Sequence, residues 1–164
     1  MARVALVTGG TRGIGEAICK GLKAAGYKVA ANYGGNDEAA QKFKAATGIP
    51  VFKWDVSNFD ACAEGVKKVE AELGPVEVLV NNAGITRDTM FHRMTPQQWN
   101  EVIGTNLGSL FNMTRQVIEG MRARKFGRVG LYDHAEAGPL LEAFGPEPLD
   151  DSFSLRDFRR RLRA

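Results

Sequence analysis

A short apolar run followed by a glycine-rich turn constrains this chain more than any other feature. Residues 4–7 are apolar, Gly9, Gly13 and Gly15 follow, and residues 17–22 have helical spacing. Strand, glycine turn and helix in this order form the start of a nucleotide-binding βαβ unit. Glycines let the backbone approach a pyrophosphate, and a helix N-terminus offers N–H groups and partial positive charge. Because the spacing is wider than G-x-G-x-x-G, a tight turn without a ligand is the alternative.

Strand-like and helix-like patterns alternate after this turn. Strands are expected at 3–8, 28–33, 51–56 and 76–80, and helices at 13–26, 37–46 and 59–73. Gly26 is expected just after the first helix, Asn36 as the N-cap of the second, and Gly74-Pro75 as the end of the third. This alternation predicts a parallel sheet with right-handed crossovers.

A long helix is expected over residues 96–124. Thr95, Pro96 and Gln98 form a start signal, with Thr as N-cap, Pro at the first helical position and Gln at the third. A broad apolar stripe follows, and a fifth strand is expected at 128–132. The stripe indicates that the chain can self-associate through this helix.

Several classes of function are disfavoured by composition. The net charge of +3 is small, and the one basic cluster lies in the last residues, so nucleic-acid binding is not expected. His92 and His134 have no ligand-spaced neighbours, so no metal site is expected. Cys19 and Cys62 are expected as reduced, packed thiols. With no apolar run of membrane-spanning length and no signal peptide, a cytoplasmic protein is expected.

The character of the chain changes near residue 130. Residues 133–151 are acidic and contain three prolines, and a short helix is expected at 153–162, ending in the basic run 159–163. We therefore divide the chain into a domain of residues 1–129 and a tail of residues 130–164.

The motifs of the first 129 residues resemble those of classical short-chain dehydrogenases/reductases. The resemblance rests on Thr8-Gly9-x3-Gly13-x-Gly15, on Asp55, on Asn81-Asn82-Ala83-Gly84 and on Asn106. Residues 82–88 and 105–107 further resemble the acetoacetyl-CoA reductases of polyhydroxyalkanoate biosynthesis, oxidoreductases that reduce a 3-oxoacyl thioester with NADPH. The implied fold is α/β, a Rossmann-like doubly wound parallel sheet, here truncated after the fifth strand and followed by an irregular or helical tail.

The resemblance also implies a set of site residues. Cofactor contacts are expected at Gly9, Thr11, Arg12, Gly13, Ile14, Gly15, Tyr33, Asp55, Val56, Asn82, Ala83 and Gly84. In the family the Asp contacts the adenine, although Asp55 is alternatively a helix cap near Ser57. The segment 82–84 would line the ribose and nicotinamide, or would simply brace the sheet edge.

Two further residues are assigned by the resemblance. Asn106 lies in mid-helix, where Asn is a poor helix former, and in the family it opens a kink and holds a water of the proton relay. An ordinary buried, hydrogen-bonded Asn is the alternative. Asp88 is the candidate for contact with an acyl-CoA substrate.

The choice of cofactor follows from charge. NAD enzymes usually place an acidic residue at the end of the second strand, whereas residues 31–34 contain none. Arg12 offers a guanidinium for a 2′-phosphate, so NADP(H) is favoured. Arg12 as an ordinary surface charge is the alternative.

The catalytic residues of the family are missing from the sequence. The family requires a Ser and a Tyr-x3-Lys pair after the fifth strand, but Tyr132 is followed four residues later by Glu136. A carboxylate would raise the phenol pKa, which opposes proton donation. We therefore expect a cofactor-binding fragment that is inactive alone, and leave open whether the chain is an enzyme.

The tail has a resemblance of its own. Residues 125–129, 145–149 and 153–162 resemble an internal piece of formamidopyrimidine-DNA glycosylases, over residues 124–164. The N-terminal Pro nucleophile of that family is absent, so DNA repair is not implied. The basic run 159–163 is a solvated helix end or a weak phosphate-binding site. A scaffold whose tail binds DNA or a protein partner, and a chain without a selected function, are the rival hypotheses.

Overall fold

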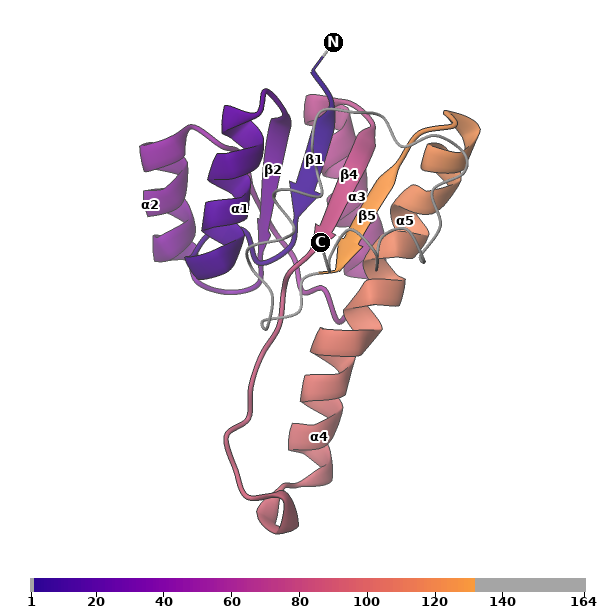
Figure 1. Ribbon diagram of the computed structural model, residues 1–164. Coiled ribbons are helices and arrows are strands. Elements are labelled where there is room, and N and C mark those ends of the chain that lie inside the picture. The colour runs from indigo at the N-terminus through magenta and orange to yellow at the C-terminus, as the bar shows by residue number, and fades with distance from the viewer. Residues whose placement is uncertain (1, 132–164) are drawn as a thin grey trace, which may run out of the picture. The chain divides into compact units, whose positions relative to one another are not determined.

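Five parallel strands form the centre of the part of the chain that the structure describes. The computed structural model describes residues 2–131, and the sheet has the order β3-β2-β1-β4-β5. The strands are β1 (Val4–Val7), β2 (Lys28–Tyr33), β3 (Val51–Lys53), β4 (Val76–Asn81) and β5 (Arg128–Leu131). Every neighbouring pair is parallel, so the carboxyl ends of all strands lie at one edge (Figure 1). The predicted doubly wound α/β sheet is confirmed.

Helices cover both faces of this sheet. They are α1 (Gly13–Ala24), α2 (Asp37–Thr47), α3 (Phe59–Leu73), α4 (Pro96–Ile103) and α5 (Ser109–Ala123), with a single 3₁₀ turn η1 (Phe91–Arg93). In Figure 1, α1 lies on one face of the sheet and α3 on the other, and α5 packs beside α3. This layering follows from the right-handed crossovers that parallel strands require.

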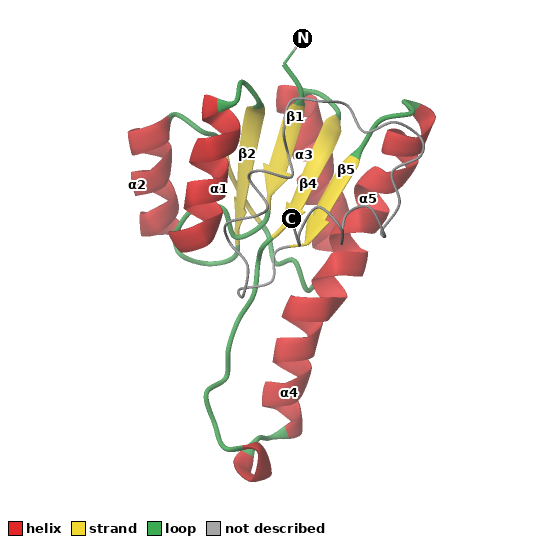
Figure 2. Cartoon of the chain, viewed as in Figure 1, coloured by secondary structure: helices red, strands yellow, loops and turns green. Residues whose placement is uncertain are grey.

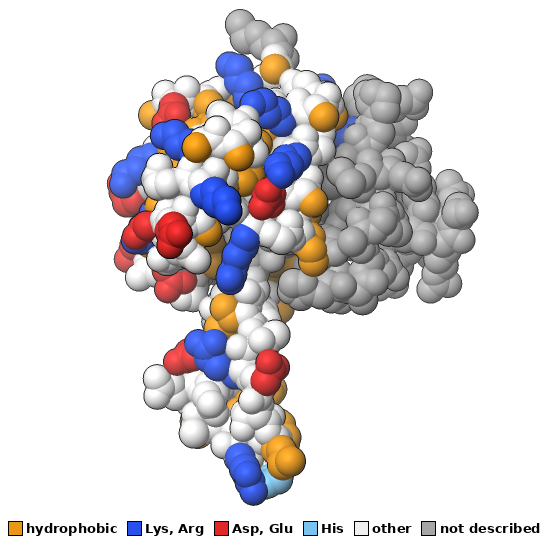
Figure 3. Space-filling view, turned by 90° about the vertical axis from the view of Figure 1, so that its left-hand side faces the viewer, with side chains coloured by type: hydrophobic (Ala, Val, Ile, Leu, Met, Phe, Trp, Pro, Cys, Tyr) orange, Lys and Arg blue, Asp and Glu red, His pale blue; other side chains and the backbone are white. Residues whose placement is uncertain are grey.

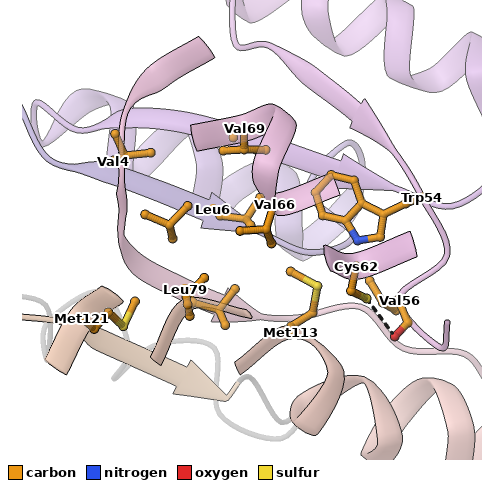
Figure 4. Packing of buried hydrophobic residues seen from close by; sticks show 13 residues of the cluster. Val4, Leu6, Trp54, Val56, Cys62, Val66, Val69, Leu79, Met113 and Met121 are labelled. Atoms are coloured by element: carbon orange, nitrogen blue, oxygen red, sulfur yellow. Dashed lines mark hydrogen bonds between the residues drawn. The ribbon is translucent and has the colours of Figure 1, made fainter. Parts of the chain in front are cut away.

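The main core lies between the sheet and the pair α3 and α5. Leu6 and Leu79 of the sheet pack in one cluster with Val66 of α3 and Met113 of α5 (Figure 4). Trp54, only 6% exposed, closes one end of this cluster. A Cβ added at Gly65 would lie 2.4 Å from the Trp54 ring. The absence of a side chain at Gly65 therefore lets α3 approach the ring closely.

The helix ends largely follow the sequence signals. Asn36 accepts a hydrogen bond from the Ala39 amide at 2.9 Å, as predicted for the N-cap of α2. Thr95 and Gln98 form the predicted capping box, with bonds in both directions. Gly26 has the positive φ, +88°, that the residue after a helix commonly adopts.

Two predicted elements differ from the structure. The third strand ends at Lys53 rather than at residue 56, because Asp55 and Ser57 form a tight turn directly after it. The long helix is not continuous: α4 and α5 are joined by a π-helical turn, η2 (Gly104–Gly108). A π turn contains one more residue per hydrogen-bonded ring than an α turn, and such turns are frequent at functional sites.

The π turn joins α4 to the body of the fold. The loop after β4, the turn η1 and α4 all extend past the carboxyl edge of the sheet (Figure 2). None of the helices in residues 2–131 is long and apolar enough to cross a lipid bilayer. Tyr132, the helix expected at 153–162 and the basic run 159–163 lie outside the described residues.

Candidate functional site

The strand order reverses between β1 and β4, and we call the region between the loops that follow these two strands, at the carboxyl edge of the sheet, the crevice. The chain runs from β1 outward to β2 and β3, and then returns to place β4 on the other side of β1. In open parallel sheets, ligands bind at this point of reversal. The loops that follow β1 and β4, residues 8–12 and 82–84, both lie there. The fold therefore brings together the glycine turn and the Asn-Ala-Gly segment.

Thr8 and Asn82 hold these two loops together. The Thr8 hydroxyl Oγ1 accepts hydrogen bonds from the backbone amides of Asn82 and Ala83, both at 3.0 Å. In return, Asn82 Nδ2 donates to the carbonyls of Thr8 at 2.9 Å and Gly9 at 3.2 Å. Asn82 thus braces the glycine turn. Its Oδ1 is buried without a hydrogen-bond partner among residues 2–131.

The three glycines of the turn, Gly9, Gly13 and Gly15, suit their positions for different physical reasons. A Cβ at Gly15 would lie 2.1 Å from the Gly9 carbonyl oxygen, so no side chain fits there. Gly9 and Gly13 have positive φ angles of +64° and +53°. At Gly13 an added Cβ would meet nothing within 4 Å, so the turn faces open space. A backbone open to solvent beside a closely packed loop fits a bound pyrophosphate.

The N-terminus of α1 is left without a side-chain cap. Asn36, Asn58 and Thr95 cap α2, α3 and α4, whereas the N-cap residue of α1, Arg12, makes no side-chain bond to its helix. The first N–H groups of a helix need acceptors from outside the helix. Those of α1 therefore remain available to an anion, with Arg12 exposed beside them.

Thr11 and Ile14 complete the turn. Thr11 is buried, at 6% exposure, whereas Ile14 is partly exposed, at 36%. The structure thus places Thr11 in the packing of the turn and Ile14 on its outer surface. Contact of either residue with a cofactor stays a prediction.

Asn32 of β2 links the loops after β1 and β3, and the sequence patterns did not predict this role. Its backbone carbonyl accepts from the Gly10 amide at 2.9 Å, and its Oδ1 accepts from the Gly9 amide at 3.4 Å. Its Nδ2 donates to the Trp54 carbonyl at 3.1 Å. Asn is depleted in strands, so a buried Asn between apolar neighbours was the available signal.

A group of three side chains lies at the carboxyl ends of β2 and β3. The Tyr33 hydroxyl donates to Asp37 Oδ1 at 3.0 Å, and Lys53 Nζ donates to Asp37 Oδ2 at 2.8 Å. The bond from Lys53, and then that from Tyr33, lowers the pKa of the Asp37 carboxyl. The bond to Asp37 raises the pKa of Lys53, while burial first and Asp37 second raise the pKa of Tyr33. Inspection of residues 31–34 alone missed this carboxylate, since it belongs to the following helix.

Asp55 shapes the loop after β3. Its Oδ1 accepts from the backbone amide and the hydroxyl of Ser57, both at 2.8 Å, and the N-cap of α3 is Asn58. Asp55 therefore forms a turn before the helix and is not its cap. Val56 is buried, and its carbonyl accepts from Asn112 Nδ2 at 3.0 Å. Contact of Asp55 and Val56 with an adenine stays a prediction.

Asn106 ties the π turn to the loop after β4. Its Oδ1 accepts from the Ile85 amide at 2.9 Å, and its Nδ2 donates to the Ile85 carbonyl at 3.0 Å. The side chain is exposed, so the alternative of an ordinary buried Asn is wrong. Its amide holds Ile85, just past Gly84, in a fixed position, and its role in a proton relay stays a prediction.

Asp88 lies in the loop between β4 and α4. Its neighbour Arg87 pairs with Glu101 of α4, with Nε 2.7 Å from Oε2, which fastens the loop to the helix. Asp88 itself is exposed. A contact with substrate stays a prediction for this residue.

Comparison with known proteins agrees with this geometry. A family model described as short chain dehydrogenase matches residues 3–129. The chain belongs to the short-chain dehydrogenase family. The match covers strands β1 to β4 completely and the first two residues of β5.

Its curated relatives extend beyond the matched part. An acetoacetyl-CoA reductase of Rhizobium meliloti (strain 1021) is 69% identical over 129 residues, covering 79% of this chain and 54% of the relative. The acetoacetyl-CoA reductase of Shinella zoogloeoides is 70% identical over 129 residues, and the match again covers 79% of this chain and 54% of the relative. Nodulation protein G of Azospirillum brasilense is 48% identical over 132 residues, covering 77% and 54%. This short-chain dehydrogenase thus spans about half the length of the relatives it matches.

Metal ligands do not cluster in the part of this short-chain dehydrogenase that the structure describes. No group of three or more His, Cys, Asp or Glu side chains within residues 2–131 is placed to hold a metal ion. The polar groups of the crevice are instead backbone amides, carboxamides, hydroxyls and single charges, which suit a nucleotide.

Proposed function

We propose that residues 3–129 bind NADP(H) as the nucleotide-binding half of a reductase of the acetoacetyl-CoA type. Such an enzyme transfers hydride to the 3-keto group of a 3-oxoacyl thioester. Support for the substrate class comes from the relatives that are 69% and 70% identical and are named acetoacetyl-CoA reductase. Support for the cofactor comes from the crevice between β1 and β4.

The observation that carries this proposal is the braced glycine turn. Asn82 holds the Gly9 carbonyl, and Gly15 packs against that carbonyl with no room for a side chain. The turn is therefore preshaped, and the uncapped N-terminus of α1 offers its amides to a pyrophosphate. Arg12 supplies a cation beside that terminus, which supports a preference for the 2′-phosphate of NADP(H).

The bound cofactor would supply the hydride, and the residues of this chain would orient it. Asn106 fixes Ile85, and Gly84, a proposed cofactor contact, directly precedes Ile85. Asp88 follows in the same loop and is the proposed contact for the thioester substrate. A proton must also reach the substrate oxygen. No tyrosine of this sequence is followed four residues later by lysine, so we expect binding without turnover.

Thermal unfolding with and without nucleotide tests the proposal. A ligand that binds only the folded state adds about 2.7 kcal/mol of stability when present at about 100 times its dissociation constant. We expect NADPH to raise the unfolding temperature, NADH to raise it less, and acetoacetyl-CoA reduction to be undetectable.

A cooperative transition that ignores both nucleotides would contradict the cofactor proposal and leave the scaffold hypothesis. Salt-dependent DNA binding that disappears when residues 150–164 are removed would favour that scaffold. Turnover of acetoacetyl-CoA would contradict only the claim of inactivity.

We also propose that the chain self-associates through α4 and α5. Four large apolar side chains, spaced four residues apart, are exposed along these helices and the turn between them. They are Trp99 (49%), Ile103 (38%), Leu107 (60%) and Phe111 (64%). We call these four residues the apolar stripe. A contiguous exposed apolar surface of this kind is a common feature of protein interfaces. A second copy is the proposed partner, because a two-fold axis would pair each stripe with its own copy.

A further inference from the structure

The group formed by Tyr33, Asp37 and Lys53 is not explained by packing. Lys53 and Asp37 are 50% and 62% exposed in their side chains, and exposed ion pairs contribute little to stability. Viewed from the side of α2, acidic and basic side chains are interspersed over this face (Figure 3). Most of them are ordinary surface charges. This group differs because Tyr33, a buried residue of β2, holds the carboxylate in place.

The position of the group relates it to the glycine turn. Tyr33 and Lys53 are direct partners in the register of β2 and β3, and both lie at the carboxyl ends of these strands. The residue before Tyr33, Asn32, accepts hydrogen bonds from the Gly9 and Gly10 amides. Tyr33, the first residue of the group, thus directly follows a residue that contacts the glycine turn. In dinucleotide-binding folds, the residue that meets the ribose 2′ position lies about 20 residues after the glycines, as Asp37 does here.

The charges of the group balance in the absence of a ligand. Asp37 carries one negative charge and Lys53 one positive charge, with 2.8 Å between Nζ and Oδ2. Asp37 alone would repel a 2′-phosphate and would accept a hydrogen bond from a 2′-hydroxyl. The positive charge of Lys53 next to Asp37 cancels this preference for a 2′-hydroxyl over a 2′-phosphate. A phosphate dianion attracts an ammonium more strongly than a single carboxylate does, and the flexible lysine stem can follow it.

We infer that Lys53, held by Asp37, determines whether the site accepts the 2′-phosphate of NADP(H). The inference rests on the proposed function and adds to it a residue and a regulating partner. When a 2′-phosphate is bound, Lys53 pairs with it and Asp37 keeps its bond from Tyr33. When a 2′-hydroxyl is bound, the pair of Lys53 and Asp37 stays intact. Asp37 therefore limits the affinity for NADP(H), and Lys53 raises it, in addition to Arg12.

Titration calorimetry with NADP⁺ and NAD⁺ tests this inference without any turnover. For Lys53→Met we expect the dissociation constant of NADP⁺ to rise about tenfold, which corresponds to one lost charge-assisted contact of about 1.4 kcal/mol. The dissociation constant of NAD⁺ is expected to change less than twofold. For Asp37→Asn we expect tighter NADP⁺ binding, since the competing carboxylate is removed.

The chain offers a matched control. Lys67 and Glu64 of α3 form another exposed pair at the same 2.8 Å, so Lys67→Met removes an equal charge elsewhere. It is expected to leave both dissociation constants unchanged. Adenosine 2′,5′-bisphosphate and adenosine 5′-monophosphate serve as probes without the nicotinamide, and should show the same contrast between wild type and Lys53→Met.

The outcomes separate the two proposals. If wild type binds neither dinucleotide, the proposed function and this inference both fail. If wild type binds NADP⁺ and Lys53→Met weakens NADP⁺ and NAD⁺ equally, or weakens neither, the inference is overturned and the proposed function stands. Circular dichroism of each variant, compared with wild type, shows whether an equal loss reflects misfolding.

Discussion

At the scale of single residues, the crevice is built from contacts that tolerate almost no change. Gly15 is the clearest case, because the backbone of Gly9 occupies the position of its missing Cβ, at 2.1 Å. A backbone carbonyl cannot move aside as the end of a side chain can. The Gly9 carbonyl also accepts from Asn82, so a shift of the turn would weaken one of the bonds that join the loops after β1 and β4.

We therefore predict that Gly15→Ala weakens NADP⁺ binding more than tenfold and lowers the free energy of unfolding by about 1–3 kcal/mol. Urea denaturation and titration calorimetry measure the two effects. Gly104→Ala is the matched control, since Gly104 has helical φ and ψ angles of −60° and −42° and open space at the Cβ position. Wild-type binding by Gly15→Ala would show that the turn is more adaptable than its packing indicates.

Residues of the crevice differ in how far the sequence reveals them. The glycines and Asn82 stand in a recognisable motif, and the structure brings them together. Asn32 and the group of Tyr33, Asp37 and Lys53 depend on the register of β2 with β3. That register is set by tertiary packing and by a loop whose path is not encoded in local propensity. A carboxylate four residues beyond a strand could therefore not be placed beforehand.

At the scale of elements, the strands and caps were predicted well and the long helix was not. The apolar spacing continues past residues 104–108, so periodicity alone predicts an unbroken helix, while the structure has a π turn there. Four of these five residues, two Gly, one Thr and one Asn, are poor helix formers. Asn106 supplies a reason, because its amide bonds to Ile85 in a distant loop and not to its own helix. Such a tertiary contact leaves no periodic signal, so the kink was indicated only by the low helix propensity of Asn106 and by the family resemblance.

The π turn has a consequence for the apolar stripe. Residues spaced four apart drift around an α-helix that has 3.6 residues per turn. The wider π turn between Ile103 and Leu107 reduces this drift, so the four exposed side chains stay closer to one line. Phe111 is further oriented by stacking on Phe59 of α3, with ring centroids 5.9 Å apart.

For Leu107→Lys we predict dissociation of the self-associated chain. Burial of a Leu contributes about 1.5–3 kcal/mol. Each residue occurs twice in a two-fold interface, so the dissociation constant should rise at least about 100-fold. Sedimentation velocity at several concentrations measures it. Asn100→Lys adds the same charge to α4 outside the stripe and is expected to leave association unchanged. A wild-type chain that is monomeric at all concentrations would refute the proposed interface.

At the scale of the whole molecule, two buried thiols make stability depend on pH. Burial, with a smaller contribution from Glu16, raises the pKa of Cys19 from 9.0 to about 12. Burial first, then the charge of Asp55, raises that of Cys62 to about 11. At a pH between 9.0 and these folded-state pKa values, the folded chain keeps thiol protons that the unfolded chain has lost. Their contribution is therefore complete below pH 9 and decreases as pH rises towards the folded-state values.

We predict that the free energy of unfolding falls above pH 9, by at most about 1.4 kcal/mol per pH unit for each thiol. Urea midpoints at intervals from pH 7 to 10.5 measure the slope. Cys19→Ala should show a shallower decline above pH 9, whatever its stability at neutral pH. Equal slopes in the variant and wild type would mean that Cys19 ionises in the folded chain as readily as in the unfolded one.

The bond between Thr8 and Asn82 also has a consequence for how the protein is made. The two residues are 74 positions apart, and chains emerge from the ribosome N-terminus first. A nascent chain that has exposed only β1, α1 and β2 already contains every glycine of the turn and Asn32, which accepts from the Gly9 and Gly10 amides, but it lacks Asn82, which holds the Gly9 carbonyl. The bonds between Thr8, Gly9 and Asn82 can therefore form only after β4 has been synthesised and has entered the sheet beside β1.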